Sequence, residues 1–320
     1  MQQTKDLSEA RRALLEHYLR GDLAAKLPAA PQAPVSIPET STTQHTQERA
    51  TAIQSGNARG VKAKLPFFFL HGDWTGNPIF CYNLAHGLGS DQPFYTIDTY
   101  DFEKQAVLPD LKTIAAEQLK MIQAVQPEGP YQLGGFCNGA LIVYEMARQL
   151  HTNGQTVDLL ILMDAIPPRY TRIRNFIERI GSWLHINQEQ QLSCFLRLQH
   201  LFRLLADRGN VEDYTFLKGS DARITHLFPP VETLRKEFAA MFIWATAQYE
   251  PAFYPGKVTL FWDEAEPIRS VWWQKMAQGK DKEVQVYTIP GSHKSCKVEQ
   301  VGDMAEQLAS CLWQVQKQRK

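Results

Sequence analysis

From residue 66 onward, short apolar runs alternate with segments whose apolar residues recur at helical spacing. One such helical segment carries Leu111, Ile114, Leu119 and Ile122, which repeat with a period near 3.6 and not with the period of two expected of a strand. The short apolar runs that predict strands are 66–70, 94–98, 131–134, 157–163, 257–262 and 284–289. Strands that alternate with helices in this way predict an α/β fold with a parallel sheet covered by helices on both faces.

Residues 167–250 break this alternation, because they are helix-patterned throughout and contain no convincing strand. Helices inserted between two strands of a sheet are the arrangement expected of a lid over an active site. The alternative is a helical subdomain with only a packing role. Trp183, Phe195, Phe202 and Trp244 are available there for an apolar pocket, although an aromatic residue on a helix more often belongs to the core.

The first part of the chain has a different character. Residues 8–20 form an amphipathic helical pattern that begins near Ser8 and ends at Gly21. Residues 27 to about 60 are rich in Pro, Ala, Thr, Gln and Ser without periodicity, which is typical of a flexible linker. We therefore predict an N-terminal helix and linker over 1–63 and the α/β domain over 64–320. The helix could dock a partner or lie as a strap on its own domain.

Composition narrows the class of protein. The chain has 320 residues, of which 44% are hydrophobic and 21% charged, so it is neither disordered nor fibrous as a whole. Its 34 basic and 34 acidic residues cancel, which argues against nucleic-acid or anionic-membrane partners. No apolar run has the length of a membrane span, and the N-terminus has no secretory pattern, so we expect a soluble cytoplasmic protein. The five cysteines are scattered without a CxxC pair, which predicts buried thiols and neither disulfides nor a metal site.

The most informative motif is Gly135-Phe136-Cys137-Asn138-Gly139, which lies between a predicted strand and a predicted helix. A nucleophile in such a turn is held at a strained backbone angle, and flanking glycines allow the neighbouring strand and helix to approach closely. The turn exposes the nucleophile at the carboxyl end of the sheet. It also places it beside a helix N-terminus, whose partial positive charge favours a thiolate. Cys137 is therefore the candidate nucleophile.

A nucleophile of this kind needs a base and an acid that orients the base. His293 follows the last predicted strand, so we expect it at the same edge of the sheet as Cys137. Asp164 and Asp263 each end a predicted strand, and either can be the acid. The one that is not the acid is expected to be a surface aspartate that caps a helix. The chain order of nucleophile, acid and histidine is that of α/β-hydrolases.

Backbone N–H groups for a developing oxyanion are predicted from two places. His71 and Gly72 directly follow the first predicted strand, and a His-Gly turn there presents N–H groups toward the nucleophile. We expect one donor to be the N–H of Asn138 and the other to be that of Asp73 or Trp74. The ring of His71 is expected to be structural, because the turn uses the backbone.

From about residue 64 to residue 315 the sequence resembles the thioesterase domains of nonribosomal peptide synthetases and polyketide synthases. The resemblance depends on the Cys137 turn and on short motifs that occur in the same order. These motifs are 69–72, 84–88, 126–131, 144–150, 162–164 with 167–168, 254–261 and 290–293. It implies an α/β-hydrolase fold with a helical lid over about 167–250. It also implies an acyl substrate that arrives on the phosphopantetheine arm of an acyl or peptidyl carrier protein, with no cofactor of the enzyme's own.

The resemblance also favours one of the two acids. In the domains that this sequence most resembles, the acid follows the strand that here ends at Asp164, whereas some relatives place it after the next strand, here at Asp263. The sequence departs from the family at the nucleophile, which is usually serine and here is Cys137, although cysteine versions exist. An acyl group on Cys137 would be a thioester, which can be hydrolysed, cyclised or transferred to an amine.

Two other functions stay open for this sequence. A small-molecule ester or lactone hydrolase would share the fold and the nucleophile but would not use a carrier protein. A catalytically silent scaffold would keep the fold and use the N-terminal helix for docking. The presence of Cys137, His293 and Asp164 together argues against the scaffold.

Overall fold

The computed structural model describes only part of the chain. The described residues are 50–55, 64–72, 79–102, 108–168, 171–206, 229–264, 273, 284–293, 295 and 297–318. The chain divides into two units, Met1–Gln47 and Glu48–Lys320, and every described residue belongs to the second. The predicted N-terminal helix over 8–20 and most of the predicted linker lie outside the described residues.

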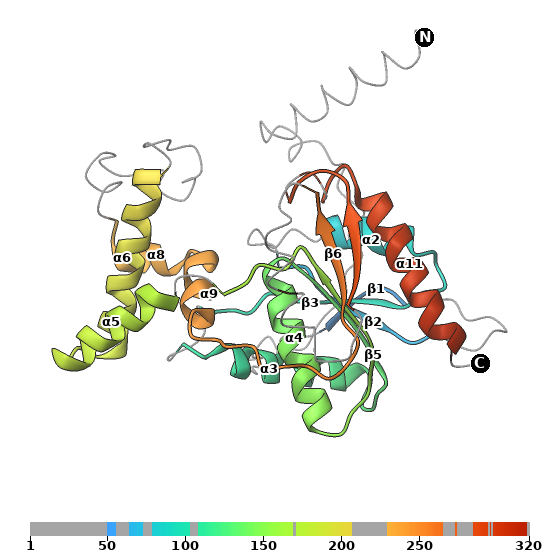
Figure 1. Ribbon diagram of the computed structural model, residues 1–320, viewed down its shortest axis with the longest axis horizontal. Coiled ribbons are helices and arrows are strands. Elements are labelled where there is room, and N and C mark those ends of the chain that lie inside the picture. The colour runs from blue at the N-terminus through green and yellow to red at the C-terminus, as the bar shows by residue number, and fades with distance from the viewer. Residues whose placement is uncertain are drawn as a thin grey trace, which may run out of the picture. The chain divides into compact units, whose positions relative to one another are not determined.

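A seven-stranded sheet runs through the second unit, with the order β1-β3-β2-β4-β5-β6-β7 (Figure 1). Its strands are β1 (Ala50–Gln54), β2 (Phe67–Leu70), β3 (Phe94–Ile97), β4 (Tyr131–Phe136), β5 (Val157–Met163), β6 (Thr259–Asp263) and β7 (Gln285–Ile289). The pairs from β3 across to β7 are parallel, and only β1 pairs in the antiparallel direction. The predicted α/β fold with a mostly parallel sheet is therefore confirmed.

Strand β1 corrects one prediction. Residues 50–54 fall in the segment predicted as a linker, yet they pair with β3 and extend the sheet at its edge. The segment gave no strand pattern because an edge strand needs little apolar surface. Here only Ala50 and Ile53 pack, half-buried, against the two sides of the sheet. The sheet thus begins before residue 64.

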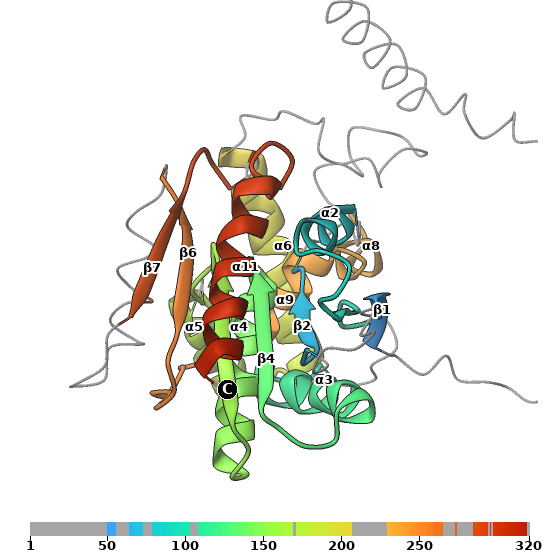
Figure 2. The same ribbon diagram turned by 90° about the vertical axis from the view of Figure 1, so that its right-hand side faces the viewer.

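Among the described residues, four helices cover the two faces of the sheet. They are α2 (Ile79–Gly87), α3 (Leu111–Val125), α4 (Asn138–Thr152) and α11 (Val301–Gln318). Helices α3 and α4 pack together on one face, and α2 and α11 on the other (Figures 1 and 2). None of the described helices is long and apolar enough to cross a membrane.

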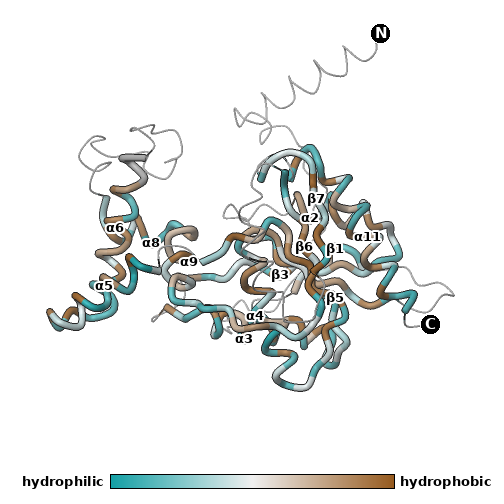
Figure 3. Tube along the Cα trace, viewed as in Figure 1, coloured by the Kyte–Doolittle hydropathy of each residue, from teal (hydrophilic) through white to brown (hydrophobic). Residues whose placement is uncertain are grey.

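Strand β2 shows how the sequence produces two cores. All four of its side chains are buried, as expected of a strand that is covered on both faces. Phe67 and Phe69 belong to the core under α2 and α11, whereas Phe68 and Leu70 belong to the core under α3 and α4. The alternation follows the period of two of a strand, and apolar residues line the central strands (Figure 3).

The helical insertion predicted between two strands is present between β5 and β6. It contains α5 (Thr171–Trp183), α6 (Gln188–Ala206), α8 (Val231–Arg235) and α9 (Phe238–Thr246), and no strand among its described residues. These helices lie together beside the sheet (Figure 1). Phe195 and Trp244 are buried and their ring centroids lie 5.1 Å apart, whereas Trp183 is 79% exposed and so lines no internal pocket.

A buried carboxylate ties the chain that leaves this insertion to α4. Glu145 is 2% exposed, and its Oε2 accepts hydrogen bonds of 2.6 Å from the Tyr249 hydroxyl and from the Arg148 guanidinium. Burial, followed by the effect of Glu145, raises the pKa of Tyr249, which keeps the hydroxyl protonated as a donor. Nearby, the Tyr144 hydroxyl donates to the carbonyl of Ala252 at 3.0 Å.

We expect Tyr249→Phe to lower the free energy of unfolding by about 1–3 kcal/mol, because a buried carboxylate oxygen loses a hydrogen-bond donor. Urea denaturation of both proteins measures this difference. The matched control is Tyr82→Phe, since Tyr82 is 52% exposed. Equal unfolding free energies for the two variants would contradict a structural role for the Glu145–Tyr249 bond.

Candidate active site

The parallel strands bring the predicted site residues to one edge of the sheet. Cys137 follows β4, Asp164 follows β5, Asp263 is the last residue of β6, and His293 lies in the loop after β7. These four strands are neighbours in the sheet, and their carboxyl ends therefore meet at the same edge. The structure brings all four side chains together from positions far apart in the sequence.

The backbone holds Cys137 in a conformation that few residues adopt. Its φ of 55° and ψ of −117° place it in a strained region, as predicted for a nucleophile between a strand and a helix. The sheet ladder continues through the turn, since the Cys137 N–H donates to the Met163 carbonyl at 2.9 Å. One strand further, the Asp164 N–H donates to the Phe261 carbonyl at 2.8 Å. These bonds fix each residue relative to the next strand.

Three glycines make this turn possible. A Cβ on Gly139 would lie 2.4 Å from the Leu70 carbonyl oxygen, and one on Gly135 would lie 2.7 Å from the backbone of Ala140. Gly72, at a φ of 59°, would place a Cβ 2.2 Å from the Phe136 carbonyl oxygen. The turn after β2 therefore packs directly against the backbone of the Cys137 turn.

His293 contacts both the candidate nucleophile, Cys137, and a candidate acid, Asp164. Its Nδ1 is hydrogen-bonded to Oδ2 of Asp164, which leaves Nε2 for the hydrogen bond that the ring makes with Cys137. The imidazole also stacks on Phe136, with ring centroids 5.2 Å apart and an angle of 23° between the ring planes. Burial lowers the pKa of His293, but its bonds with Asp164 and Cys137 have a larger combined effect and raise that pKa to about 9.

Asp263 differs from the expectation for the aspartate that is not the acid. That residue was expected at the surface as a helix cap, but Asp263 is only 2% exposed. A carboxylate oxygen of Asp164, a carboxylate oxygen of Asp263 and a ring nitrogen of His293 all lie within 4.8 Å of one another. The surface prediction is therefore wrong for Asp263, because β6 delivers it to the same buried edge as β5 delivers Asp164. Two carboxylates and an imidazole could also accept a metal ion, but here one carboxylate is already bonded to the ring.

The oxyanion side of the site is only partly described. Asn138 is the first residue of α4, so its N–H has no partner within the helix and is free of the helical ladder. The other predicted donors, Asp73 and Trp74, lie outside the described residues. His71 is 6% exposed, in keeping with the structural role expected of its ring.

No role for the Asn138 side chain was predicted from the sequence. Its Nδ2 lies 3.4 Å from the Cys137 sulfur and 3.4 Å from the Gly72 carbonyl oxygen. The only available signal was that asparagine, next to a candidate nucleophile, can donate a side-chain hydrogen bond. Of the other described cysteines, Cys81 and Cys311 are buried as expected, but Cys194 is exposed, which corrects that prediction.

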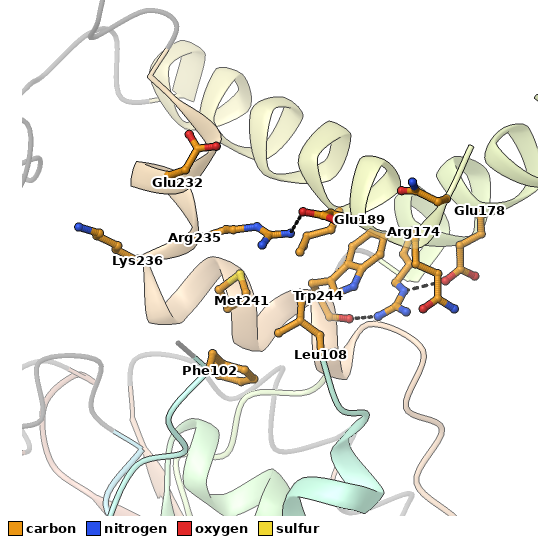
Figure 4. A pocket seen from close by; sticks show the side chains of 13 residues that line it. Phe102, Leu108, Arg174, Glu178, Glu189, Glu232, Arg235, Lys236, Met241 and Trp244 are labelled. Atoms are coloured by element: carbon orange, nitrogen blue, oxygen red, sulfur yellow. Dashed lines mark hydrogen bonds and ion pairs between the residues drawn. The ribbon is translucent and has the colours of Figure 1, made fainter. Parts of the chain in front are cut away.

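A cavity of about 580 Å³ lies among the inserted helices (Figure 4). Its described lining is Phe102, Leu108, Arg174, Glu178, Asn187, Gln188, Glu189, Leu192, Glu232, Arg235, Lys236, Met241 and Trp244. The Arg174 guanidinium lies 4.0 Å from the centroid of the Trp244 ring and is paired with Glu178 at 3.0 Å. Helix α9 contributes Met241 and Trp244 to this cavity, and none of the described lining residues is a candidate catalytic residue.

Comparison with models of protein families identifies the family of this chain. Residues 74–312, well over half of the chain, match the model of the thioesterase domain. The chain belongs to the thioesterase domain family. The predicted resemblance is confirmed at this level, and membership supports a hydrolase activity.

Curated relatives of this thioesterase domain are much longer proteins. It is 36% identical over 113 residues to a dimodular nonribosomal peptide synthase of Bacillus subtilis (strain 168), which covers 35% of this chain and 5% of the relative. It is 31% identical over 177 residues to the non-reducing polyketide synthase rdc1 of Metacordyceps chlamydosporia, which covers 52% of this chain and 8% of the relative. The chain thus spans less than a tenth of the length of these relatives.

A solved structure has a related fold. A four-domain nonribosomal peptide synthetase in its holo form, bound to AMP and glycine, matches with a TM-score of 0.54 and 19% identity. The match covers 82% of this chain and 20% of that one. Together with the mostly parallel sheet and its order, it supports the predicted α/β-hydrolase fold.

We expect His293 in the thioesterase domain to titrate near pH 9 and Asp164→Asn to lower its pKa toward the ordinary value of 6.5. The pKa is raised in the folded chain, so the stability contributed by charged His293 is fully present below pH 6.5 and is lost as the pH rises through about 9. NMR of histidine-labelled protein measures the titration, with the exposed Asp303→Asn as control. An unchanged titration in Asp164→Asn would contradict the assigned hydrogen bond.

Proposed function

We propose that this domain releases or transfers an acyl chain from the phosphopantetheine thioester of an acyl or peptidyl carrier protein, through an acyl-enzyme on Cys137. The observation that supports this most is the position of His293, which is hydrogen-bonded to Asp164 on one side and to Cys137 on the other. Cys137 occupies the strained turn after β4 in a chain of the thioesterase family. The similarity to regions of a peptide synthase and a polyketide synthase supports the carrier-bound substrate.

Acylation follows from this geometry. His293 accepts the proton of the Cys137 thiol, and the thiolate attacks the carbonyl carbon of the incoming thioester. The carbonyl oxygen gains negative charge and accepts hydrogen bonds from the N–H of Asn138 and from that of Asp73 or Trp74, the second donor predicted from the sequence. The carbon–sulfur bond to the pantetheine breaks, and His293 returns its proton to the departing thiolate. Asp164 orients the ring through Nδ1 and stabilises its charged form.

Deacylation uses the same groups in reverse. Water, an amine or a hydroxyl of the acyl chain attacks the carbonyl carbon of the acyl-enzyme and gives its proton to His293. The bond between that carbon and the Cys137 sulfur then breaks, and His293 restores the thiol. Because acylation exchanges one thioester for another, the acyl group keeps its high reactivity. Cyclisation and aminolysis are therefore available beside hydrolysis.

The inserted helices are proposed as the lid, in agreement with the expectation for about 167–250. Helix α9 has two sides: Phe238 and Phe242 help line a small cavity beside Asn138, and Met241 and Trp244 line the large cavity of Figure 4. The helix therefore stands between the nucleophile turn and the large cavity. An acyl chain that entered the large cavity would need α9 to move.

Cys137→Ala is expected to abolish both turnover and the acyl adduct, because the sulfur is the atom that bonds to the acyl group. Intact-protein mass spectrometry after mixing with acyl-carrier thioesters detects the adduct. The exposed Cys194→Ala is the matched control and should keep it. An adduct that persists in Cys137→Ala would overturn the assignment. The enzyme could instead turn over a carrier-bound acyl group and a simple ester of the same acyl chain at equal rates, which would support a small-molecule hydrolase. If no substrate forms an adduct, the result would support a scaffold.

Asp164→Asn is expected to reduce turnover far more than Asp263→Asn, because Asp164 holds the hydrogen bond to Nδ1. Loss of the acid costs on the order of 10⁴ in turnover where serine is the nucleophile, and less where a cysteine and histidine already ionise each other. Steady-state kinetics on one carrier-bound substrate gives the ranking. The opposite ranking would assign the acid to Asp263.

A further inference from the structure

The side chain of Asn138 reaches the reacting atom of the site. It is 4% exposed, and its Nδ2 lies 3.4 Å from the sulfur of Cys137, within hydrogen-bond distance for a sulfur acceptor. The same nitrogen lies 3.4 Å from the carbonyl oxygen of Gly72. The carboxamide therefore bridges Cys137 and the turn after β2.

The contact with Gly72 determines which end of the carboxamide faces the sulfur. A backbone carbonyl oxygen only accepts hydrogen bonds, so the atom of Asn138 that faces it must be the N–H-bearing nitrogen. That same nitrogen faces the Cys137 sulfur. The sulfur therefore receives a donor, and Nδ2 has one hydrogen for each of its two acceptors.

We propose that the Asn138 side chain is a catalytic residue that stabilises the thiolate form of Cys137 by donating an N–H from Nδ2 to the sulfur. A thiol sulfur is a weak acceptor, whereas a thiolate is a charged one, so this bond strengthens when the proton leaves. The proton itself goes from the sulfur to Nε2 of His293, and no other bond forms or breaks. The inference uses the proposed function only in taking Cys137 as the nucleophile.

The charged groups around Cys137 differ from the Asn138 carboxamide in their effect on the thiolate. His293 contacts the sulfur and its positive form favours the thiolate, but the buried carboxylates of Asp164 and Asp263 lie behind that ring and disfavour a further negative charge. His71, in the turn after β2, is buried. A carboxamide stabilises the thiolate at every pH, and it does not compete with His293 for Asp164.

Lys297 is the other described cation near this edge. Its Nζ lies 5.8 Å from the centroid of the Phe136 ring, the ring on which His293 stacks. Its Nζ faces the Phe136 ring, whereas Nδ2 of Asn138 lies 3.4 Å from the sulfur itself. A substitution of Asn138 therefore tests the effect of its side chain while Lys297 stays unchanged.

The test is the pH dependence of alkylation of Cys137 by iodoacetamide, measured at the peptide level by mass spectrometry so that other cysteines do not contribute. Asn138→Leu has nearly the same size and lacks the donor, and it should move the midpoint of the alkylation rate upward by about one pH unit. Asn138→Asp replaces the donor by a negative charge and should move the midpoint further in the same direction. Asn153→Leu, at the other end of the same helix and exposed, should leave it unchanged.

A midpoint that stays in place in both Asn138 variants while each remains folded by circular dichroism would overturn the proposal, even if their rates fall. A purely structural role would change the rate without moving the midpoint. Alkylation needs no acyl substrate, so this result is independent of turnover. An enzyme whose midpoint moves as expected but which forms no acyl adduct would contradict the proposed function and leave the role of Asn138 intact.

Discussion

The site depends on a backbone contact between two turns, one after β2 and one after β4. The carbonyl oxygen of Phe136 lies where a side chain on Gly72 would begin, and the carbonyl of Leu70 lies where a side chain on Gly139 would begin. This contact fixes the distance between Cys137 and the backbone of the turn after β2. It leaves room for the carboxamide of Asn138 to reach across to Gly72 at 3.4 Å. The strained conformation of Cys137 persists because both sides of the turn are packed.

The parallel sheet positions the other side chains of the site. Neighbouring strands end at one edge, and hydrogen bonds of the ladder continue one residue beyond β4 and β5 to hold Cys137 and Asp164. The same regularity delivers Asp263 beside them and creates a buried group of two carboxylates and one imidazole. Burial of a carboxylate is costly, and a charged His293 offsets part of that cost, in agreement with the raised pKa of His293.

The inserted helices are held to this framework at their return to the sheet. Glu145, on the same helix that begins at the nucleophile, binds Tyr249 just after α9. A displacement of α9 relative to the Cys137 turn would therefore strain the hydrogen bond between Tyr249 and Glu145, because Glu145 is on α4. This arrangement connects the cavity of Figure 4 to α4 through α9.

The sequence by itself determined the alternation of strands and helices, the helical insertion and the turn around Cys137, because these depend on local periodicity and on glycine spacing. It also placed His293 and the two aspartates at one edge, since parallel strands share that edge. It could not show β1, whose strand has little apolar surface, nor choose between Asp164 and Asp263 without a family resemblance. Strand order decides which carboxylate bonds Nδ1 of His293 and how deeply the other is buried. The direction of the Asn138 carboxamide depends on the packing of two turns that are more than 60 positions apart in the chain. Only the tertiary structure decided them, because they are distances between segments that the sequence does not place relative to one another.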